Sequence, residues 1–299
     1  MKNAFGLELY EIKEVIAEKQ VKQAIAYALL PVLIYLGIPS DKSKELIENC
    51  MQEASGYSKL ADYEAQAHNI LDEEKVADRI PEKLRARAEL IYSQIEQYLL
   101  PGAVLDYGCG DGRVAELIAK NRGQEVFLAD VYEHSHVKET GLNFKLFKQG
   151  KEAPFNDNTF DNTLALTVYH HSSKPLESIK DTCRITKQNG RVIVIESVYG
   201  VNGKELPEAK RSQIQSYLTL TSEQQRKVNI FFDHFYNRVL HYSKEAETKV
   251  NVPFNFNTPG NWRKIFTQYN LTQENVFHLG LDQRTVPEYH TLHVLRKVR

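Results

Sequence analysis

The sequence predicts a doubly wound α/β domain, with a helical arm before it and a helical segment inserted into it. Three observations support this prediction. Short apolar runs alternate with helical segments from residue 104 onward, residues 1–98 show only helical periodicity, and the alternation stops between Tyr199 and Thr258. Strand, helix and strand in succession are typical of a parallel sheet with right-handed crossovers.

Composition and charge exclude several classes of protein. The 299 residues carry 38 Lys and Arg against 39 Asp and Glu, a net charge of -1. A general nucleic-acid binder normally has a basic surplus, so we expect no nucleic-acid partner. Cys50, Cys109 and Cys183 are few and far apart, which indicates neither a disulfide framework nor a cysteine-based zinc site.

The start of the chain lacks the pattern of a targeting segment. Glu8, Glu11 and Glu14 stand where a signal peptide would have its apolar core. The most apolar stretch, residues 24–38, contains Pro31 and is shorter than the ~20 residues that a membrane span requires. We therefore expect a cytoplasmic protein without membrane association.

Residues 1–98 form the predicted arm. Apolar residues recur at helical spacing, and a later stripe lies on a helix expected to open near Pro81, since proline is favoured in a first turn. We find no strand pattern here. The two stripes are Ile12, Val15, Ile16, Val21, Ala24, Ile25, Ala28 and Leu29, and then Leu84, Ala88, Ile91, Ile95 and Tyr98.

Residues 99–299 form the predicted α/β domain. Its strands are expected at residues 104–107, 126–129, 163–168 and 191–196, with closing strands around 276–279 and 291–298. These runs are apolar without alternation, as in strands buried on both faces. One helix carries Val114 and Ile118, and another carries Ile179 and Cys183.

The predicted insert covers about residues 200–257. A helix is expected to start at Thr221, because Thr221 and Gln224 fit a capping box. A second helix is expected after the insert at Thr258–Pro259, a cap followed by a first-turn proline. Aromatic residues are frequent in the insert, and we expect this segment to form a lid over a small organic acceptor.

The strongest local signal is VLDYGCGDGR at residues 104–113. A buried strand ends in Asp106, and glycines then allow the backbone to approach a ligand closely. Arg113 occupies the place of the third glycine in the dinucleotide fingerprint GxGxxG, so that fingerprint is absent. The segment resembles motif I of class I S-adenosylmethionine-dependent methyltransferases that act on small molecules.

Further segments along the chain are similar to this family in the expected order. Asp130 follows Gly112 by eighteen residues, where the family has an acidic residue that accepts both ribose hydroxyls. Residues 149–161 are similar to the segment before the fourth strand, although Gln149 stands where an adenine-binding Asp is common. The runs TVYHH (167–171) and NGRVIVIE (189–196) look like the end of the fourth strand and the fifth strand.

The resemblance implies a Rossmann-like, seven-stranded sheet that binds S-adenosylmethionine at the carboxyl ends of the first strands. It covers about residues 100–198. The cofactor-binding residues that it implies are Asp106, Tyr107, Gly108, Cys109, Gly110, Asp130, Val131, Gln149, Gly150 and Thr167.

The residues predicted to contact the methyl acceptor are mainly histidines. His170 and His171 end the fourth strand beside the expected methyl group, and histidine titrates near neutrality, as a general base requires. On the Thr221 helix, His234 and His241 share a predicted face with Asn237 and Arg238, which either lines an acceptor pocket or faces solvent. We expect no metal, although His170 or His171 with His234, His241 or His290 is an alternative ligand set.

Methyl transfer to an O, N or C atom of a small molecule, plausibly in specialised biosynthesis, is therefore the predicted reaction. One alternative is a nicotinamide-dependent oxidoreductase on the same architecture, against which the missing third glycine argues. Another is a non-catalytic module that binds cofactor or mediates assembly. The apolar early helices could pair two chains as a homodimer.

Overall fold

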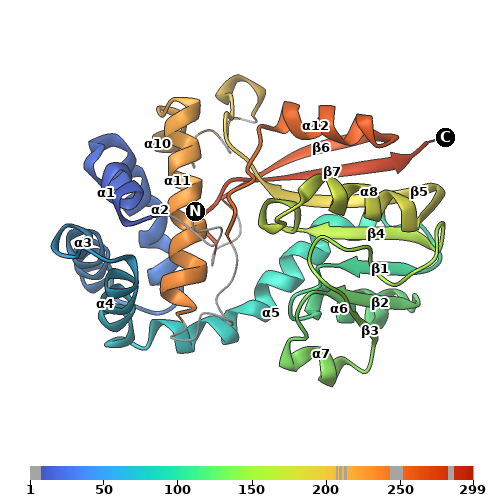
Figure 1. Ribbon diagram of the computed structural model, residues 1–299, viewed down its shortest axis with the longest axis horizontal. Helices are drawn as coiled ribbons and strands as arrows, with labels where there is room; N and C mark the ends of the chain where they lie inside the picture. Colours follow the sequence, from blue (N-terminus) through green and yellow to red (C-terminus); the bar gives the residue numbers. More distant parts are fainter. Residues whose placement is uncertain are drawn as a thin grey trace. The chain divides into compact units, whose positions relative to one another are not determined.

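The computed structural model describes residues 8–206, 208, 211, 214–242, 252–281 and 286–298. Contacts within the chain define two compact units (Figure 1). The helical unit comprises Met1–Leu84, Val198–Phe256 and Gly280–Tyr289, and the sheet unit comprises Arg85–Ser197, Asn257–Leu279 and His290–Arg299. The predicted boundaries of the arm, the domain and the insert stay predictions.

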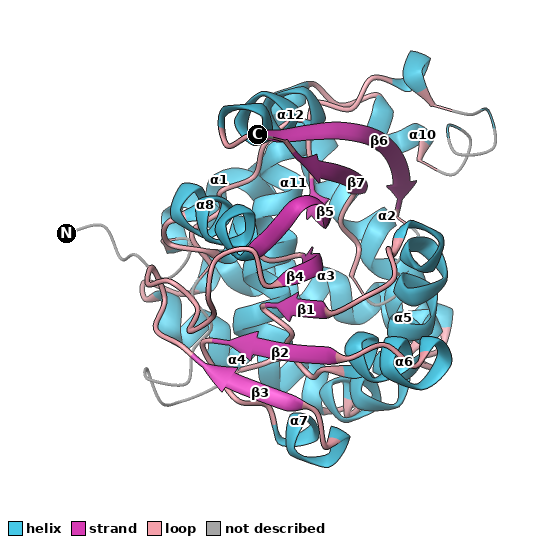
Figure 2. Ribbon diagram, turned by 90° about the vertical axis from the view of Figure 1, so that its right-hand side faces the viewer, coloured by secondary structure: helices cyan, strands magenta, loops and turns pink. Residues whose placement is uncertain are grey.

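The sheet unit is built on seven strands in the order β3-β2-β1-β4-β5-β7-β6, which Figure 2 shows edge to edge. Strands β1 to β5 pair in parallel, and β7 runs antiparallel to β5. The seven-stranded α/β fold predicted from the sequence is thus confirmed. The strands are β1 (Val104–Tyr107), β2 (Val126–Asp130), β3 (Asn143–Leu146), β4 (Phe160–Leu166), β5 (Thr186–Ser197), β6 (Leu271–Gly280) and β7 (His290–Lys297).

Helices cover both faces of this sheet, as a doubly wound fold requires. On one face, Ile91, Ile118 and Val137 pack with alternate residues of β1 and β2. On the other, Leu105, Phe160 and Ile185 form a second core. The helices are α5 (Val76–Ile95), α6 (Arg113–Arg122) and α7 (Ser135–Thr140) for the first face, and α8 (Pro175–Ile185) and α12 (Pro259–Gln268) for the second (Figure 2). Short turns are η1 (Glu96–Tyr98) and η2 (Tyr169–His171).

Three elements of the sheet unit differ from the predicted ones. Strand β3 and helix α7 were not predicted, because both are short and the residues of β3 are mostly exposed. Strand β4 ends at Leu166 rather than at residue 168, because Thr167 adopts a left-handed backbone with φ of 60°. This conformation cannot continue a strand.

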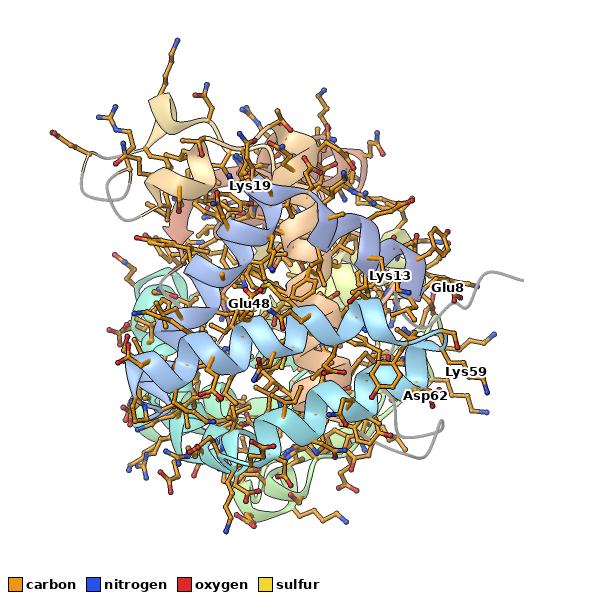
Figure 3. All side chains as sticks on the ribbon, turned by 90° about the vertical axis from the view of Figure 1, so that its left-hand side faces the viewer. Glu8, Lys13, Lys19, Glu48, Lys59 and Asp62 are labelled. Carbon is orange, nitrogen blue, oxygen red and sulfur yellow. The ribbon has the colours of Figure 1, made fainter. Side chains whose placement is uncertain are left out.

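The helical unit joins the N-terminal helices to the segment after β5. Its elements are α1 (Leu9–Ala17), α2 (Lys19–Tyr35), α3 (Ser40–Gly56), α4 (Leu60–Asp72), the start of α5, η3 (Gly203–Glu205), α10 (Gln215–Leu218), α11 (Ser222–His234) and the π-helix η4 (Phe235–Leu240). Figure 3 shows α1 to α4 in front of α11, with exposed charged residues such as Lys19, Glu48 and Asp62 on the viewer's side. Ile25 and Phe231 are among the side chains buried inside.

The junction of the two segments is also polar. Glu18, between α1 and α2, accepts a hydrogen bond from the Nζ of Lys227 on α11 at 2.8 Å. The predicted capping box is confirmed, since the Thr221 hydroxyl accepts from the backbone N–H of Gln224 and the Gln224 side chain accepts from that of Thr221. These contacts fix the start of α11 against the N-terminal helices.

Two helix predictions were wrong in position. Helix α5 begins at Val76, so Pro81 lies inside it rather than at its start. Val76 and Ile80 are buried, each worth about 1.5–3 kcal/mol, which offsets the ~3 kcal/mol cost of an interior proline. The helix that starts after Thr221 stops being α-helical at His234, where the wider turn of η4 changes the spacing of the side chains that follow.

Membrane-spanning segments were searched among the described residues. None of their helices combines the length and the apolar character that a crossing requires.

Candidate cofactor and acceptor site

The candidate cofactor site lies at the carboxyl ends of β1, β2 and β4. Strand β1 has β2 on one side and β4 on the other, so the chain reverses its direction of winding at this point. In open α/β sheets, ligands bind in the crevice at such a switch point. The predicted cofactor residues Asp106, Gly110 and Asp130 all reach this edge of the sheet.

The glycine loop after β1 is held by the neighbouring strand β2. The backbone N–H of Gly108 donates to the carbonyl of Ala129 at 2.7 Å. A Cβ atom on Gly108 would stand 2.6 Å from a methyl carbon of Val168, so only glycine fits there. Gly110 has φ of 53°, and a Cβ on it would meet no described atom within 4 Å. The loop is therefore packed on one side and open on the other.

Asp130 ties the end of β2 to this loop. Its Oδ2 atom accepts the backbone N–H of Gly110 at 2.8 Å, and its Oδ1 atom accepts that of Val131 at 2.6 Å. Burial raises the pKa of Asp130, while these N–H donors act in the opposite direction. The Oδ1 atom also accepts the backbone N–H of Tyr132 at 3.3 Å, so the acceptor capacity that remains for a ligand's hydroxyl group is on Oδ2.

Asp106 is a buried carboxyl group with a strongly raised pKa. Its residue is 2% exposed, and its Oδ1 atom has no hydrogen-bond partner among the residues that the structure describes. Burial, together with the like charges of Asp130 and Asp111, raises the pKa of Asp106 to about 7. An unpaired buried carboxyl group between two acids is unfavourable without a cation nearby.

These features fit S-adenosylmethionine. Its sulfonium and α-ammonium groups are cations, and its ribose offers two hydroxyl donors. Asp106 and Asp111 supply the negative charge, Gly110 supplies the open backbone, and Asp130 supplies carboxylate acceptors. The donor set therefore matches the charge and the hydroxyl groups of this cofactor.

The other residues predicted to bind the cofactor differ in burial and in what they contact. The Tyr107 ring packs on Phe147 with centroids 5.2 Å apart, so only its backbone borders the loop. Burial raises the pKa of the Cys109 thiol, which makes it unreactive. The side chain of Val131 is 47% exposed at the end of β2. Gln149 donates from its amide to the carbonyl of His171 at 3.4 Å.

Gly150 and Thr167 both adopt a left-handed backbone conformation. Gly150 has φ of 71° and lies under the Lys174 side chain. It borders a small cavity of about 30 Å³, which is large enough to hold water. Thr167 has φ of 60°, an uncommon conformation for a β-branched residue, and strain of this kind clusters at functional sites.

The turn after β4 carries the predicted histidines. The rings of His170 and His171 lie 4.1 Å apart between centroids, and the His170 Nδ1 atom lies 2.6 Å from Oε2 of Glu196. Burial and the nearby Arg87 charge lower the pKa of His170 to about 3. Sequence reasoning placed Glu196 in a strand and missed this contact. The signal available was an acidic residue at the end of an otherwise apolar strand.

The predicted histidines of the insert belong to the helical unit. His234 is buried, and its Nε2 atom lies 3.5 Å from Oε1 of Glu64 on α4. Arg238 of the π-helix lies 3.4 Å from the same oxygen through its Nε atom. His241 is exposed at the end of the π-helix, and its ring contacts that of Tyr236. The structure thus joins His234 and Arg238 around Glu64, a buried acid that sequence reasoning missed.

Comparison with known proteins agrees with this fold. Residues 105–194 match the family model of the methyltransferase domain. An uncharacterized protein of Methanocaldococcus jannaschii is 29% identical over 112 residues, which make up 36% of this chain and 52% of that protein. The chain therefore matches about half the length of this curated relative.

Solved structures with low sequence identity are similar to this chain. One is a chain of the complex between the Haloferax volcanii Trm112 methyltransferase activator and a methyltransferase, with 12% identity and a TM-score of 0.51 over 77% of this chain and 96% of that one. Another is geranyl diphosphate C-methyltransferase from Streptomyces coelicolor, in complex with Mg²⁺, geranyl diphosphate and S-adenosyl-L-homocysteine. It has 10% identity and a TM-score of 0.46 over 75% of this chain and 84% of that one.

The family match falls on the strands that carry the glycine loop, Asp130 and the turn with His170. The seven-stranded sheet has the parallel order and antiparallel seventh strand described above. Residues 105–194 of this chain are thus a class I S-adenosylmethionine-dependent methyltransferase domain, and S-adenosylmethionine is its cofactor.

Proposed function

We propose that this enzyme transfers the methyl group of S-adenosylmethionine to an O, N or C atom of a small-molecule acceptor. The observation that carries the proposal is the buried Asp106 carboxyl group, unpaired among the described residues and flanked by Asp111 and Asp130 beside the open backbone of Gly110. This arrangement favours a cationic ligand. The acceptor class and a role in specialised biosynthesis are part of the proposal.

The residues have separate roles in the proposed reaction. The bound cofactor supplies an electrophilic methyl group. Asp106 and the Gly108–Gly110 backbone hold the amino acid end of the cofactor, Asp130 accepts from the ribose, and Gln149 lies on the adenine side. Methyl transfer is an in-line displacement, so the main task of the protein is alignment of the two reactants.

We assign the acceptor side to the histidines. His170 and His171, which follow β4 directly, are the two proposed proton acceptors, and His171 is the better candidate because His170 is 1% exposed and burial lowers its pKa to about 3. For the helical unit taken by itself, we propose that His234 and Arg238, beside Glu64, and His241 further along the chain are polar binding residues. A π-turn inside a helix is often found at a functional site, which supports this assignment.

Isothermal titration calorimetry tests the cofactor first. We expect binding of S-adenosylmethionine and S-adenosylhomocysteine, and none of NAD. Transfer of label from methyl-tritiated cofactor to a panel of phenols, amines, acids and isoprenoid compounds then tests the acceptor. Binding of NAD in place of the sulfur nucleosides would refute the proposal, and label found only in protein or RNA would refute the small-molecule acceptor.

Pairing of two chains and a cytoplasmic location stay predictions. Helix α2 exposes Tyr27 and Ile34, with exposed fractions of 55% and 45%, on one face at a spacing of two turns. Sedimentation equilibrium of the wild type and of Ile34→Glu tests the homodimer, because a charge on this face would separate the chains.

A further inference from the structure

Glu196 lies at the carboxyl end of β5 and binds the backbone of the turn that follows β4. Its Oε1 atom accepts the N–H groups of Tyr169 at 2.6 Å and Val168 at 3.1 Å. Its Oε2 atom accepts the N–H of His170 at 3.3 Å. Because the Glu196 side chain is fully buried, these N–H groups depend on it rather than on bulk solvent. One carboxyl group thus holds the backbone of three successive residues.

The turn is strained at its first residue. Thr167 has φ of 60°, a conformation that a β-branched residue rarely adopts and that its surroundings must keep in place. The backbone N–H of Thr167 donates to the carbonyl of Ile195 at 2.6 Å, directly before Glu196. The end of β5 therefore holds both the strained residue and the residues after it. Without these contacts, we expect the turn to relax toward an ordinary backbone conformation.

The turn supports the glycine loop that follows β1. The side chain of Val168 packs directly on Gly108, since a Cβ atom on that glycine would stand 2.6 Å and 2.9 Å from the two methyl carbons of the valine. Strand β2 also binds the loop, because the N–H groups of Gly108 and Cys109 donate to the carbonyl of Ala129 at 2.7 Å and 3.2 Å. The loop is thus held by β2 and by Val168, and the backbone of Val168 is held by Glu196.

We propose that Glu196 is a positioning residue of the cofactor site, which acts through Val168 to keep the glycine loop in the conformation that binds S-adenosylmethionine. The inference rests on the proposed function, because that function assigns the Gly108–Gly110 backbone to the amino acid end of the cofactor. The contacts of Glu196 are with the turn. Its carboxyl group therefore affects cofactor binding through the shape of the loop.

The anchoring contacts are present in either protonation state of Glu196. Burial raises the pKa of its carboxyl group to about 8, so the group is mostly protonated at pH 7. Its Oε2 atom lies 2.6 Å from Nδ1 of His170, whose pKa burial lowers to about 3, so a carboxyl proton on Oε2 can be donated to a neutral ring. The Oε1 atom remains an acceptor for Tyr169 and Val168. Glutamine, with one carbonyl oxygen and one NH₂ donor, reproduces this neutral form.

Amide hydrogen exchange of the full chain, followed by nuclear magnetic resonance, tests the inference without a ligand. In Glu196→Ala we expect the N–H groups of Gly108 and Cys109 to exchange about tenfold faster or more, because Val168 no longer holds the loop against β2. Glu196→Gln should restore slow exchange. Wild-type exchange of these groups in Glu196→Ala would overturn the proposal. Exchange in Glu196→Gln as fast as in Glu196→Ala would overturn it too.

Calorimetry with S-adenosylhomocysteine at pH 7 measures the effect on binding. We expect the dissociation constant to rise about tenfold or more in Glu196→Ala and to stay within about threefold of the wild-type value in Glu196→Gln, which loses only the 3.3 Å contact. Val168→Ala keeps the backbone contacts and removes the methyl groups that pack on Gly108, so it should also weaken binding. This variant decides the question if Glu196→Ala does not fold. Wild-type affinity in Val168→Ala would overturn the proposal.

A matched control lies near the opposite end of β4. Asn162 is fully buried and holds the backbone of Leu100 through two hydrogen bonds of 2.8 Å. Asn162→Ala should lower stability without changing the exchange of Gly108 or the affinity for S-adenosylhomocysteine. The same loss of affinity as in Glu196→Ala would make that loss a general result of lowered stability and would overturn the positioning role. Failure of the wild type to bind S-adenosylhomocysteine would refute the proposed function, while the exchange of Gly108 would still decide the role of Glu196.

Discussion

Cofactor binding should depend on pH through Asp106. Its pKa in the free protein is raised to about 7 by burial and by the neighbouring acids Asp130 and Asp111. A bound α-ammonium or sulfonium group stabilises the ionised carboxylate and so lowers this pKa. Because the complex prefers the ionised form, affinity is highest above pH 7 and falls as the pH decreases through this value.

The size of the effect follows from the fraction of Asp106 that is ionised. With a pKa of about 7 this fraction is about 0.76 at pH 7.5 and about 0.09 at pH 6. The dissociation constant should therefore rise about eightfold over this range, or about 1.2 kcal/mol.

Calorimetry with S-adenosylhomocysteine between pH 6 and pH 7.5 measures this dependence. Titrations at pH 6 in two buffers of different ionisation enthalpy should show that about 0.9 proton is released for each ligand bound. Asp106→Asn is the control, in which binding is weaker and both the pH dependence and the proton release are lost. A wild-type affinity that is flat over this range, with no proton released, would refute the assignment of Asp106 to the cationic end of the cofactor.

Four further predictions concern single residues. Asp130→Ala should weaken binding of S-adenosylhomocysteine at least tenfold in calorimetry, and unchanged affinity would exclude its role at the ribose. Gly108→Ala should lower the free energy of unfolding by about 1–3 kcal/mol in urea, because its Cβ would stand 2.6 Å from Val168. Thr167→Gly should raise the free energy of unfolding by up to about 1 kcal/mol, and a loss of stability would contradict the inferred strain. Glu64→Ala should destabilise the protein by about 3–5 kcal/mol, because His234 and Arg238 lose their buried acidic partner. A melting temperature equal to that of the wild type would show that the two basic side chains do not depend on Glu64.

The central strands could be predicted because burial on both faces leaves a plain sequence signal. Residues 104–107 are apolar except for Asp106, and all four are buried in β1. Strand β3 gives no such signal, because it lies at the edge of the sheet and is mostly exposed. The start of α5 was misplaced because Pro81 indicates a first turn, whereas tertiary burial of Ile80 extends the helix beyond it.

Sequence analysis could likewise predict only part of the candidate site. Asp106 and Asp130 follow strands at a spacing that the sequence displays, and the structure places both at one edge of the sheet. Glu196 and Glu64 have partners that are distant in the chain, His170 and His234, at separations that no local pattern encodes. A carboxylate at the end of a strand or on a helix looks like any surface acid until its neighbours are known.

The assembly of the helical unit from three stretches of chain has a consequence for biosynthesis. Helices α1 to α4 are translated before the sheet unit, yet Phe231 and Phe232, which share their apolar interior, are translated only after the five parallel strands. Until then the nascent helices expose apolar surface, and chaperones recognise such surface. Removal of the N-terminal helices to obtain a minimal catalytic fragment would strip α11 of its covering, so such a fragment should aggregate when it is produced alone.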